Sequence, residues 1–182
     1  MRKKKKQLPF FLYIVLLAGA VFLLVRHFHI KHFNVIEPDV LYTSGQPRGM
    51  DYTRLLYKYN IGSIVNVRSA SEHRERHWHN EEVTWVRNNG VNYFELPIEK
   101  SDDLPDEQTR QEFLAIMADK TNLPVLLHDS DGRKRVSILA AVWALKANKY
   151  SVDEAIGLVE RIKEQPLLDA ERNFINSLAQ QQ

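Results

Sequence analysis

Cysteine is absent from all 182 residues of the chain. This absence excludes disulfide bonds, thiolate metal sites and any thiol nucleophile. Extracytoplasmic proteins often carry disulfides but do not need them, so the absence says nothing about compartment. Any covalent or acid–base chemistry must therefore use oxygen or nitrogen side chains.

Acidic residues are absent from residues 1–31, which hold seven of the 25 basic residues. The other 18 basic residues and all 23 acidic residues lie in 32–182, which gives that part a net charge of −5. A mildly acidic body is a poor nucleic-acid surface, so we expect no nucleic-acid partner.

One long uncharged run stands out, the 18 residues LPFFLYIVLLAGAVFLLV at 8–25. As a helix it would be roughly 27 Å long, close to the thickness of a bilayer core. The sequence therefore predicts a membrane-spanning anchor. A cleaved signal peptide is the alternative, but its small-residue site at 18–20 would lie inside the apolar run.

The charges around this run predict its orientation. Basic residues are denser before it than after it, which places the N-terminus in the cytoplasm and the domain outside it, as in a single-pass membrane protein. The predicted organisation is a basic cytoplasmic tail, an anchor, a connector and one domain, at 1–7, 8–25, 26–35 and 36–182.

Histidines occur in two groups that could suggest a metal. His27, His29 and His32 in the connector do not share one helix face, and they suit a membrane interface. His73 and His77 have the i, i+4 spacing of a metal pair, but no third ligand is evident. We expect solvent-facing histidines, no metal site and no cofactor.

Strand and helix patterns alternate through the rest of the chain. Short β-branched or apolar runs predict strands at 40–47, 61–67, 91–98 and 124–128. Longer periodic runs predict helices at 50–60, 71–90, 106–120, 136–147, 151–162 and 167–180. This alternation predicts an α/β domain with a mainly parallel central sheet and helices on both faces.

The segment LLHDSDGRKR at 126–135 joins a buried strand to an apolar helix. Gly132 permits a backbone conformation closed to other residues, so successive N–H groups can point inward. Arg135 could bind an anion with two parallel hydrogen bonds, and Arg133 and Lys134 add charge at the rim. The pattern predicts an anion-binding loop; the alternative is an ordinary turn with solvated charges.

The pattern His128-Asp129-x-x-Gly132-x-x-Arg135 resembles the His-Cys-x-x-Gly-x-x-Arg signature of the cysteine-dependent protein tyrosine and dual-specificity phosphatases. The similarity extends in order over about 40–150. The resemblance implies the fold of this family and its activity, which is the hydrolysis of phosphomonoesters without a metal. It also implies that His128 and Arg68 support the site. The implied phosphate-binding residues are Ser130, Asp131, Gly132, Arg133, Lys134 and Arg135.

Two positions depart from that signature. Asp129 stands where the family has its nucleophilic cysteine, and Val136 stands where it usually has a hydroxyl that helps the thiolate leave. A carboxylate is a weaker nucleophile, and it would compete with phosphate for the loop's N–H groups and Arg135. We therefore expect little or no hydrolysis by the chain as written. A natural pseudophosphatase and an introduced replacement would have the same sequence.

Two other functions stay open. The domain could be a pseudophosphatase that binds or scaffolds a phosphorylated or acidic partner at a membrane. Asp129 could also form an aspartyl-phosphate, but such enzymes depend on Mg²⁺, and no convincing magnesium cluster is present. The ligand could be a phosphoprotein or a phospholipid head group.

The implied general acid should lie in EKSDDLPDE at 99–107. Asp102 is the first candidate and Asp103 the alternative, because both precede Pro105 on the loop that leaves a strand. Both could also be solvated loop residues only. Asp106 is better placed to cap the next helix.

Overall fold

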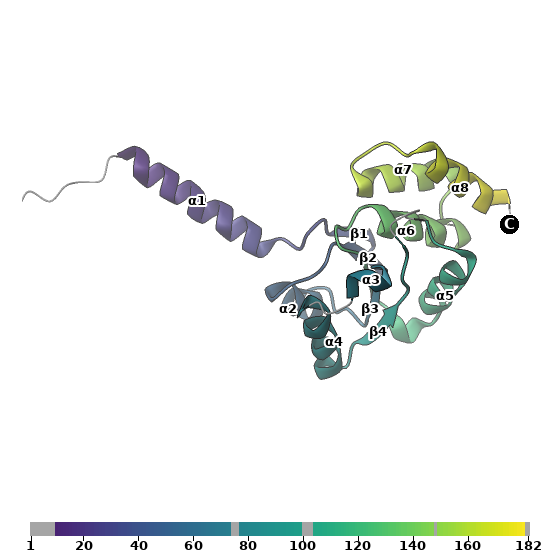
Figure 1. Ribbon diagram of the computed structural model, residues 1–182, viewed down its shortest axis with the longest axis horizontal. Coiled ribbons are helices and arrows are strands. Elements are labelled where there is room, and N and C mark those ends of the chain that lie inside the picture. The colour runs from purple at the N-terminus through teal and green to yellow at the C-terminus, as the bar shows by residue number, and fades with distance from the viewer. Residues whose placement is uncertain (1–9, 74–76, 100–103, 148, 181–182) are drawn as a thin grey trace, which may run out of the picture.

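Five strands form one sheet in the computed structural model, which describes residues 10–73, 77–99, 104–147 and 149–180 (Figure 1). Their order is β1-β2-β5-β3-β4, and only β1 runs antiparallel to its neighbour. The prediction of a mainly parallel sheet is confirmed. The strands are β1 (Asn34–Glu37), β2 (Leu41–Ser44), β3 (Ser63–Asn66), β4 (Asn92–Glu95) and β5 (Val125–His128).

Helices cover both faces of this sheet (Figure 1). In β5, Leu126 packs with α2 (Met50–Tyr57) and α4 (His77–Asn89) on one face, whereas Leu127 packs with α5 (Glu107–Ala118) and α6 (Lys134–Lys146) on the other. This alternation follows from the two-residue repeat of a strand. The helices of the domain are α2 (Met50–Tyr57), α3 (Ala70–His73), α4 (His77–Asn89), α5 (Glu107–Ala118), η1 (Lys120–Asn122), α6 (Lys134–Lys146), α7 (Val152–Lys163) and α8 (Asp169–Gln180).

The strand register brings three strand ends to one edge of the sheet. His128 at the end of β5 pairs with Ser44 of β2 on one side and with Asn66 of β3 on the other. The segments that follow these strands therefore meet at the carboxyl end of the sheet, where ligands of open α/β sheets bind.

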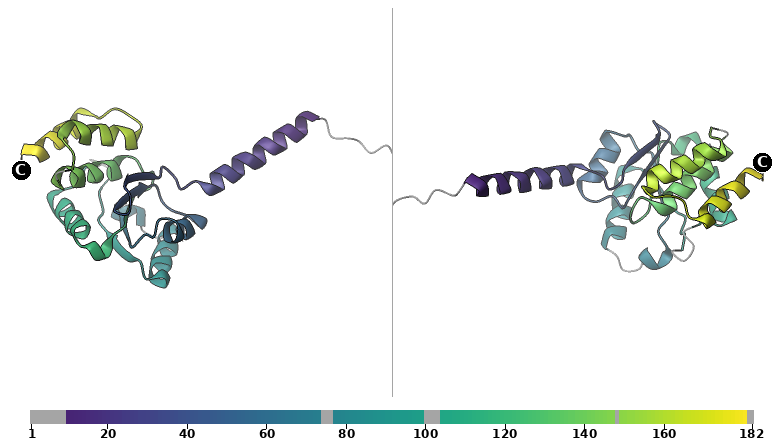
Figure 2. Two further views of the ribbon diagram at one scale, coloured as in Figure 1. Left: turned by 180° about the vertical axis from the view of Figure 1, so that it is seen from behind. Right: turned by 90° about the horizontal axis from the view of Figure 1, so that it is seen from above.

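The first helix, α1 (Phe10–Phe28), projects away from the domain in every view (Figure 1, Figure 2). Its described side chains are exposed, including Phe10 and Phe22. Within the ranges given above, no helix combines the length and the apolarity needed to span a bilayer. The prediction of a membrane-spanning helix at 8–25 is therefore not supported.

Two further boundaries differ from the sequence prediction. Strand β1 begins at Asn34, within the segment expected to be a connector. Within the helix expected at 71–90, the structure describes α3 up to His73 and α4 from His77 to Asn89, and residues 74–76 lie outside the described residues. The predicted cap of α5 is present, because the Asp106 carboxylate accepts the N–H of Thr109 at 2.7 Å.

Candidate functional site

A tight loop connects β5 to α6 and lies against the end of β2. Gly132 has φ +83°, and a Cβ built there would lie 2.5 Å from the carbonyl carbon of Ser44. Gly45 makes the same approach from the other side, since a Cβ there would be 2.8 Å from the backbone oxygen of Asp131. The two glycines let the loop and β2 approach each other at backbone distance.

Alanine substitution should lower the stability at Gly132, where the loop meets β2, and raise it at Gly157, which has open space around it. Replacing Gly132 with alanine adds a positive-φ strain and a backbone collision, so we expect a loss of about 2 kcal/mol or more in unfolding free energy. Gly157 of α7 has open space around its Cβ position, so Gly157→Ala should stabilise by about 0.5–1 kcal/mol. Urea unfolding followed by circular dichroism measures both. Equal effects of the two substitutions would contradict this account.

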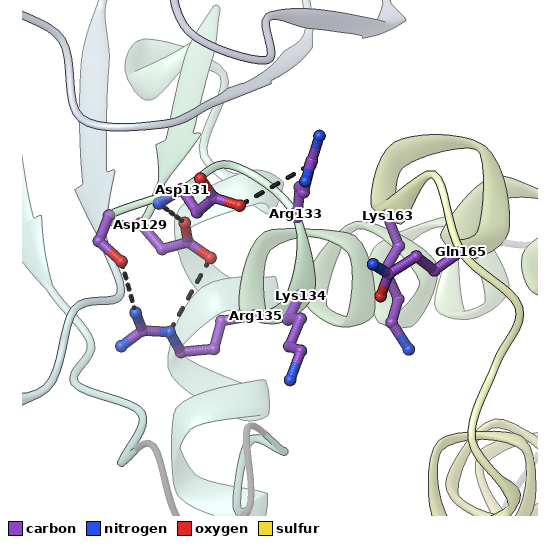
Figure 3. Close-up of a pocket in the computed structure, with 8 residues that line it drawn as sticks. Asp129, Asp131, Arg133, Lys134, Arg135, Lys163 and Gln165 are labelled. Atoms are coloured by element: carbon purple, nitrogen blue, oxygen red, sulfur yellow. Dashed lines mark hydrogen bonds and ion pairs between the residues drawn. The ribbon is translucent and has the colours of Figure 1, made fainter.

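The Asp129 carboxylate occupies the place where the backbone N–H groups of the loop converge. Its Oδ1 accepts the backbone N–H groups of Asp131, at 2.7 Å, and of Gly132, at 2.5 Å. Its Oδ2 lies 3.9 Å from Nε of Arg135, and the residue is only 2% exposed. Figure 3 shows the Asp129 carboxylate directed toward the Arg135 guanidinium. The inward N–H groups thus hold an anion that belongs to the chain.

Arg135 is buried at the first turn of α6 and has partners on several segments. Its Nη2 donates to Oγ of Ser130 at 3.2 Å, and its Nη1 donates to Oε2 of Glu72 at 2.7 Å. The same Nη1 contacts the carbonyl oxygen of Ile98 at 3.3 Å. These contacts tie the loop to α3 and to the segment after β4.

Glu72 balances the positive charge in the loop. Burial alone would raise the pKa of this carboxyl, but the hydrogen bond from Arg135, the N–H of Ser69 and the charge of Arg68 lower it to about 2. Arg68 lies 3.4 Å from Glu72 and over the ring of Trp78 at 3.7 Å. The inner site therefore consists of two guanidinium groups, of Arg68 and Arg135, and two carboxylates, of Glu72 and Asp129. With Asp129 charged, its net charge is zero.

The outer residues of the loop pair with other segments. The Asp131 side chain lies 2.7 Å from Nζ of Lys31, and His32 contacts its backbone oxygen. Arg133 donates to Glu164 at 2.6 Å. The Asp131 side chain thus pairs with the segment before β1, and the sequence did not predict the contacts of Lys31 and His32.

A cavity of about 330 Å³ opens beside the loop (Figure 3). Its volume is at the lower end of ligand pockets, which hold roughly 300–1,000 Å³. The far wall comes from the end of α7 and the segment after it. The lining residues are Asp129, Ser130, Asp131, Arg133, Lys134, Arg135, Lys163 and Gln165.

A buried carboxylate, Glu82 of α4, lies beneath the loop. It accepts hydrogen bonds from Gln46 at 2.9 Å and from Tyr52 at 3.3 Å through Oε1. Oε1 also lies 3.2 Å from Nε2 of His128, the residue just before Asp129. Oε2 accepts from Tyr93 at 3.0 Å and from Asn66 at 3.2 Å. Glu82 thus fixes the base of the loop from the side of α4.

The ionisation of this group follows from its partners. Burial would raise the pKa of Glu82, but His128 and the hydrogen-bond donors outweigh it and lower the pKa. Burial, and then the charge of Glu82, raises the pKa of Tyr52 and of Tyr93. Both hydroxyls therefore stay protonated and donate.

The sequence-predicted residues are only partly brought together. His128, Asp129 and Arg135 meet at the loop, and Arg68 reaches it through Glu72 and through Gln46, to which it donates at 3.1 Å. The general-acid candidates Asp102 and Asp103 lie outside the described residues.

Among the residues that support the loop, the sequence also did not predict Glu72, Glu82 and Gln46. The only hint of Glu82 in the sequence is polar residues inside expected strands, such as Asn66, which need buried partners.

Comparisons with known proteins agree with this architecture. Residues 28–176 match the tyrosine phosphatase family. A Saccharomyces cerevisiae relative, the tyrosine-protein phosphatase-like protein OCA2, is 22% identical over 109 residues, 59% of this chain and 53% of that protein. The chain thus spans about half the length of that curated relative.

Solved structures show the same fold. The catalytic core of the S. cerevisiae PP-IP phosphatase SIW14, in complex with citrate, has a TM-score of 0.67 at 16% identity, over 81% of this chain and 85% of that chain. PTPMT1 in complex with PI(5)P has a TM-score of 0.68 at 15% identity, over 83% and 96%.

Proposed function

The chain belongs to the tyrosine phosphatase family, and we propose that its domain is a phosphomonoester site that the chain's own Asp129 holds closed. In this proposal the domain has little or no hydrolase activity as written, because the nucleophile position carries a carboxylate. Arg135 and the loop N–H groups supply the phosphate recognition that the family resemblance implies.

The contact of Asp129 with the N–H groups of Asp131 and Gly132 is the observation that carries this proposal. A bound phosphate would need the same donors, because the inward N–H groups and Arg135 are the anion-binding groups of such a loop. Phosphate binding therefore requires the Asp129 carboxylate to move away or to lose its charge.

A second function, a pseudophosphatase that binds a phosphorylated or acidic partner, is favoured by the cavity beside the loop. The cavity reaches beyond Asp129 to Lys134 and to the end of α7, so a ligand could lie beside the loop without displacing the carboxylate. PTPMT1 has been seen with PI(5)P, which supports a phospholipid head group as the ligand. A phosphoprotein is the alternative.

Inorganic phosphate binding to the full chain tests the proposal. We expect Asp129→Ala to bind phosphate about tenfold more tightly or better, because it frees two N–H groups and leaves one net positive charge in the inner site. Isothermal titration calorimetry at fixed ionic strength gives both affinities.

Asp131→Ala is the matched control, since it removes the same charge from the same loop. The Asp131 side chain lies outside the N–H groups, so its removal should change phosphate affinity by no more than roughly threefold. If the unaltered chain binds phosphate as tightly as Asp129→Ala, the loop is open and the binding function takes precedence. If a folded Asp129→Ala variant binds none, the phosphate site itself is wrong.

A further inference from the structure

His73, His79 and Glu95 come together on the side of the domain next to the loop, from α3, α4 and the end of β4. One ligand atom of each lies within 4.8 Å of the others. His79 Nε2 is 2.6 Å from Glu95 Oε1, and His73 Nδ1 is 3.7 Å from Glu95 Oε2. The two imidazole rings are stacked, with centroids 4.8 Å apart.

One nitrogen of the His73 ring makes no hydrogen bond within the described residues. Its Nε2 is buried and has no hydrogen-bond partner among the described residues. The other ring nitrogen, Nδ1, is the one that faces Glu95. Coordination through Nδ1 would use the neutral ring.

We propose that His73, His79 and Glu95 form a divalent transition-metal site, best suited to Zn²⁺. Two imidazoles and one carboxylate are a ligand set that zinc uses in proteins, with the fourth position left to water. Zinc–nitrogen bonds of about 2.0–2.1 Å place tetrahedral ligand atoms about 3.3 Å apart. On zinc binding, the 2.6 Å contact between His79 and Glu95 would have to lengthen, and the distances from His73 to the other two ligands would have to shorten. Rotations of these partly exposed side chains allow both changes.

The proposed metal site is linked to the phosphate loop through Glu72 and His73, which are neighbours in the chain. Glu72, the partner of Arg135, directly precedes His73 on the single turn of α3. A metal joining α3 to α4 and β4 would fix the segment that positions Glu72. The proposal is independent of whether the loop binds phosphate, since its ligands lie outside the loop.

Zinc binding to the full chain, prepared without a polyhistidine tag, tests this inference. We expect one equivalent of Zn²⁺ by competition with a fluorescent chelator, and a rise in the thermal unfolding midpoint on zinc addition. His79→Ala and Glu95→Gln should each weaken zinc binding about tenfold or more and remove the rise.

His77→Ala is the matched control. His77 lies on the same helix as His79 but outside the cluster, so its loss should leave zinc affinity within roughly twofold. The inference is wrong if zinc does not bind at micromolar concentration, or if His77→Ala weakens binding as much as His79→Ala. It is also wrong if His79→Ala and Glu95→Gln both keep the original affinity. Circular dichroism of each variant shows that the domain remains folded.

Discussion

Replacing Asp129 with cysteine is expected to raise hydrolysis of p-nitrophenyl phosphate at least about a thousandfold over the chain as written, without added metal. The substitution restores the family's nucleophile within a loop whose N–H groups already hold an anion. The same donors and Arg135 would lower the thiol pKa, so the thiolate could attack phosphorus and the phenolate would leave.

The choice of substrate isolates this step. p-Nitrophenolate leaves readily, so the assay depends little on a general acid, for which Asp102 and Asp103 are the candidates from the sequence. Val136 replaces the hydroxyl that the family resemblance associates with release of the thiolate. We therefore expect a burst of about one p-nitrophenolate per chain followed by slower turnover, seen by stopped-flow absorbance.

Asp129→Ser is the matched control, because it opens the loop without supplying a thiol. It should bind phosphate but not turn over. If a folded Asp129→Cys variant is as inactive as Asp129→Ser, with and without Mg²⁺, the loop is not a catalytic site and the binding function remains. Strict Mg²⁺-dependent hydrolysis by the chain as written would instead indicate an aspartyl-phosphate enzyme.

The sheet and the loop could be predicted because their signals are local. The β-branched run at 61–67 gives β3, and the step from an apolar run through Gly132 to an apolar helix gives the β5–α6 loop. Strand β1 could not be predicted, because NVIE lacks a clear alternation and its antiparallel pairing with β2 decides its structure.

The partners of the loop could not be predicted because they are distant in sequence. Lys31 and His32 contact the loop across 99 positions, and nothing in a polar connector indicates this. The metal candidate shows the same limit. The i, i+4 spacing indicates a pair of His73 and His77, whereas the structure brings His73 together with His79 and Glu95.

Replacing Glu82 with alanine should be the most destabilising single change at the base of the loop. It would leave His128 without its carboxylate partner and would remove the acceptor of four hydrogen bonds from Gln46, Tyr52, Asn66 and Tyr93. Breaking a buried pair from one side costs about 3–5 kcal/mol, because the remaining groups stay buried without partners. We expect a loss in this range in urea unfolding and a fall of about 10 °C in the thermal midpoint.

Glu81→Ala is the matched control for this result, since Glu81 is the preceding residue of α4 and is exposed. It should change the unfolding free energy by no more than about 0.5 kcal/mol. Glu82→Gln should fall between the two, because the amide keeps one acceptor oxygen but loses the charge opposite His128. If Glu81→Ala and Glu82→Ala destabilise equally, helix propensity rather than the buried carboxylate explains the loss. If only Glu82→Ala does, a residue remote from the cavity fixes both the end of β5 and, through Gln46 and Arg68, the position of Glu72 beside Arg135.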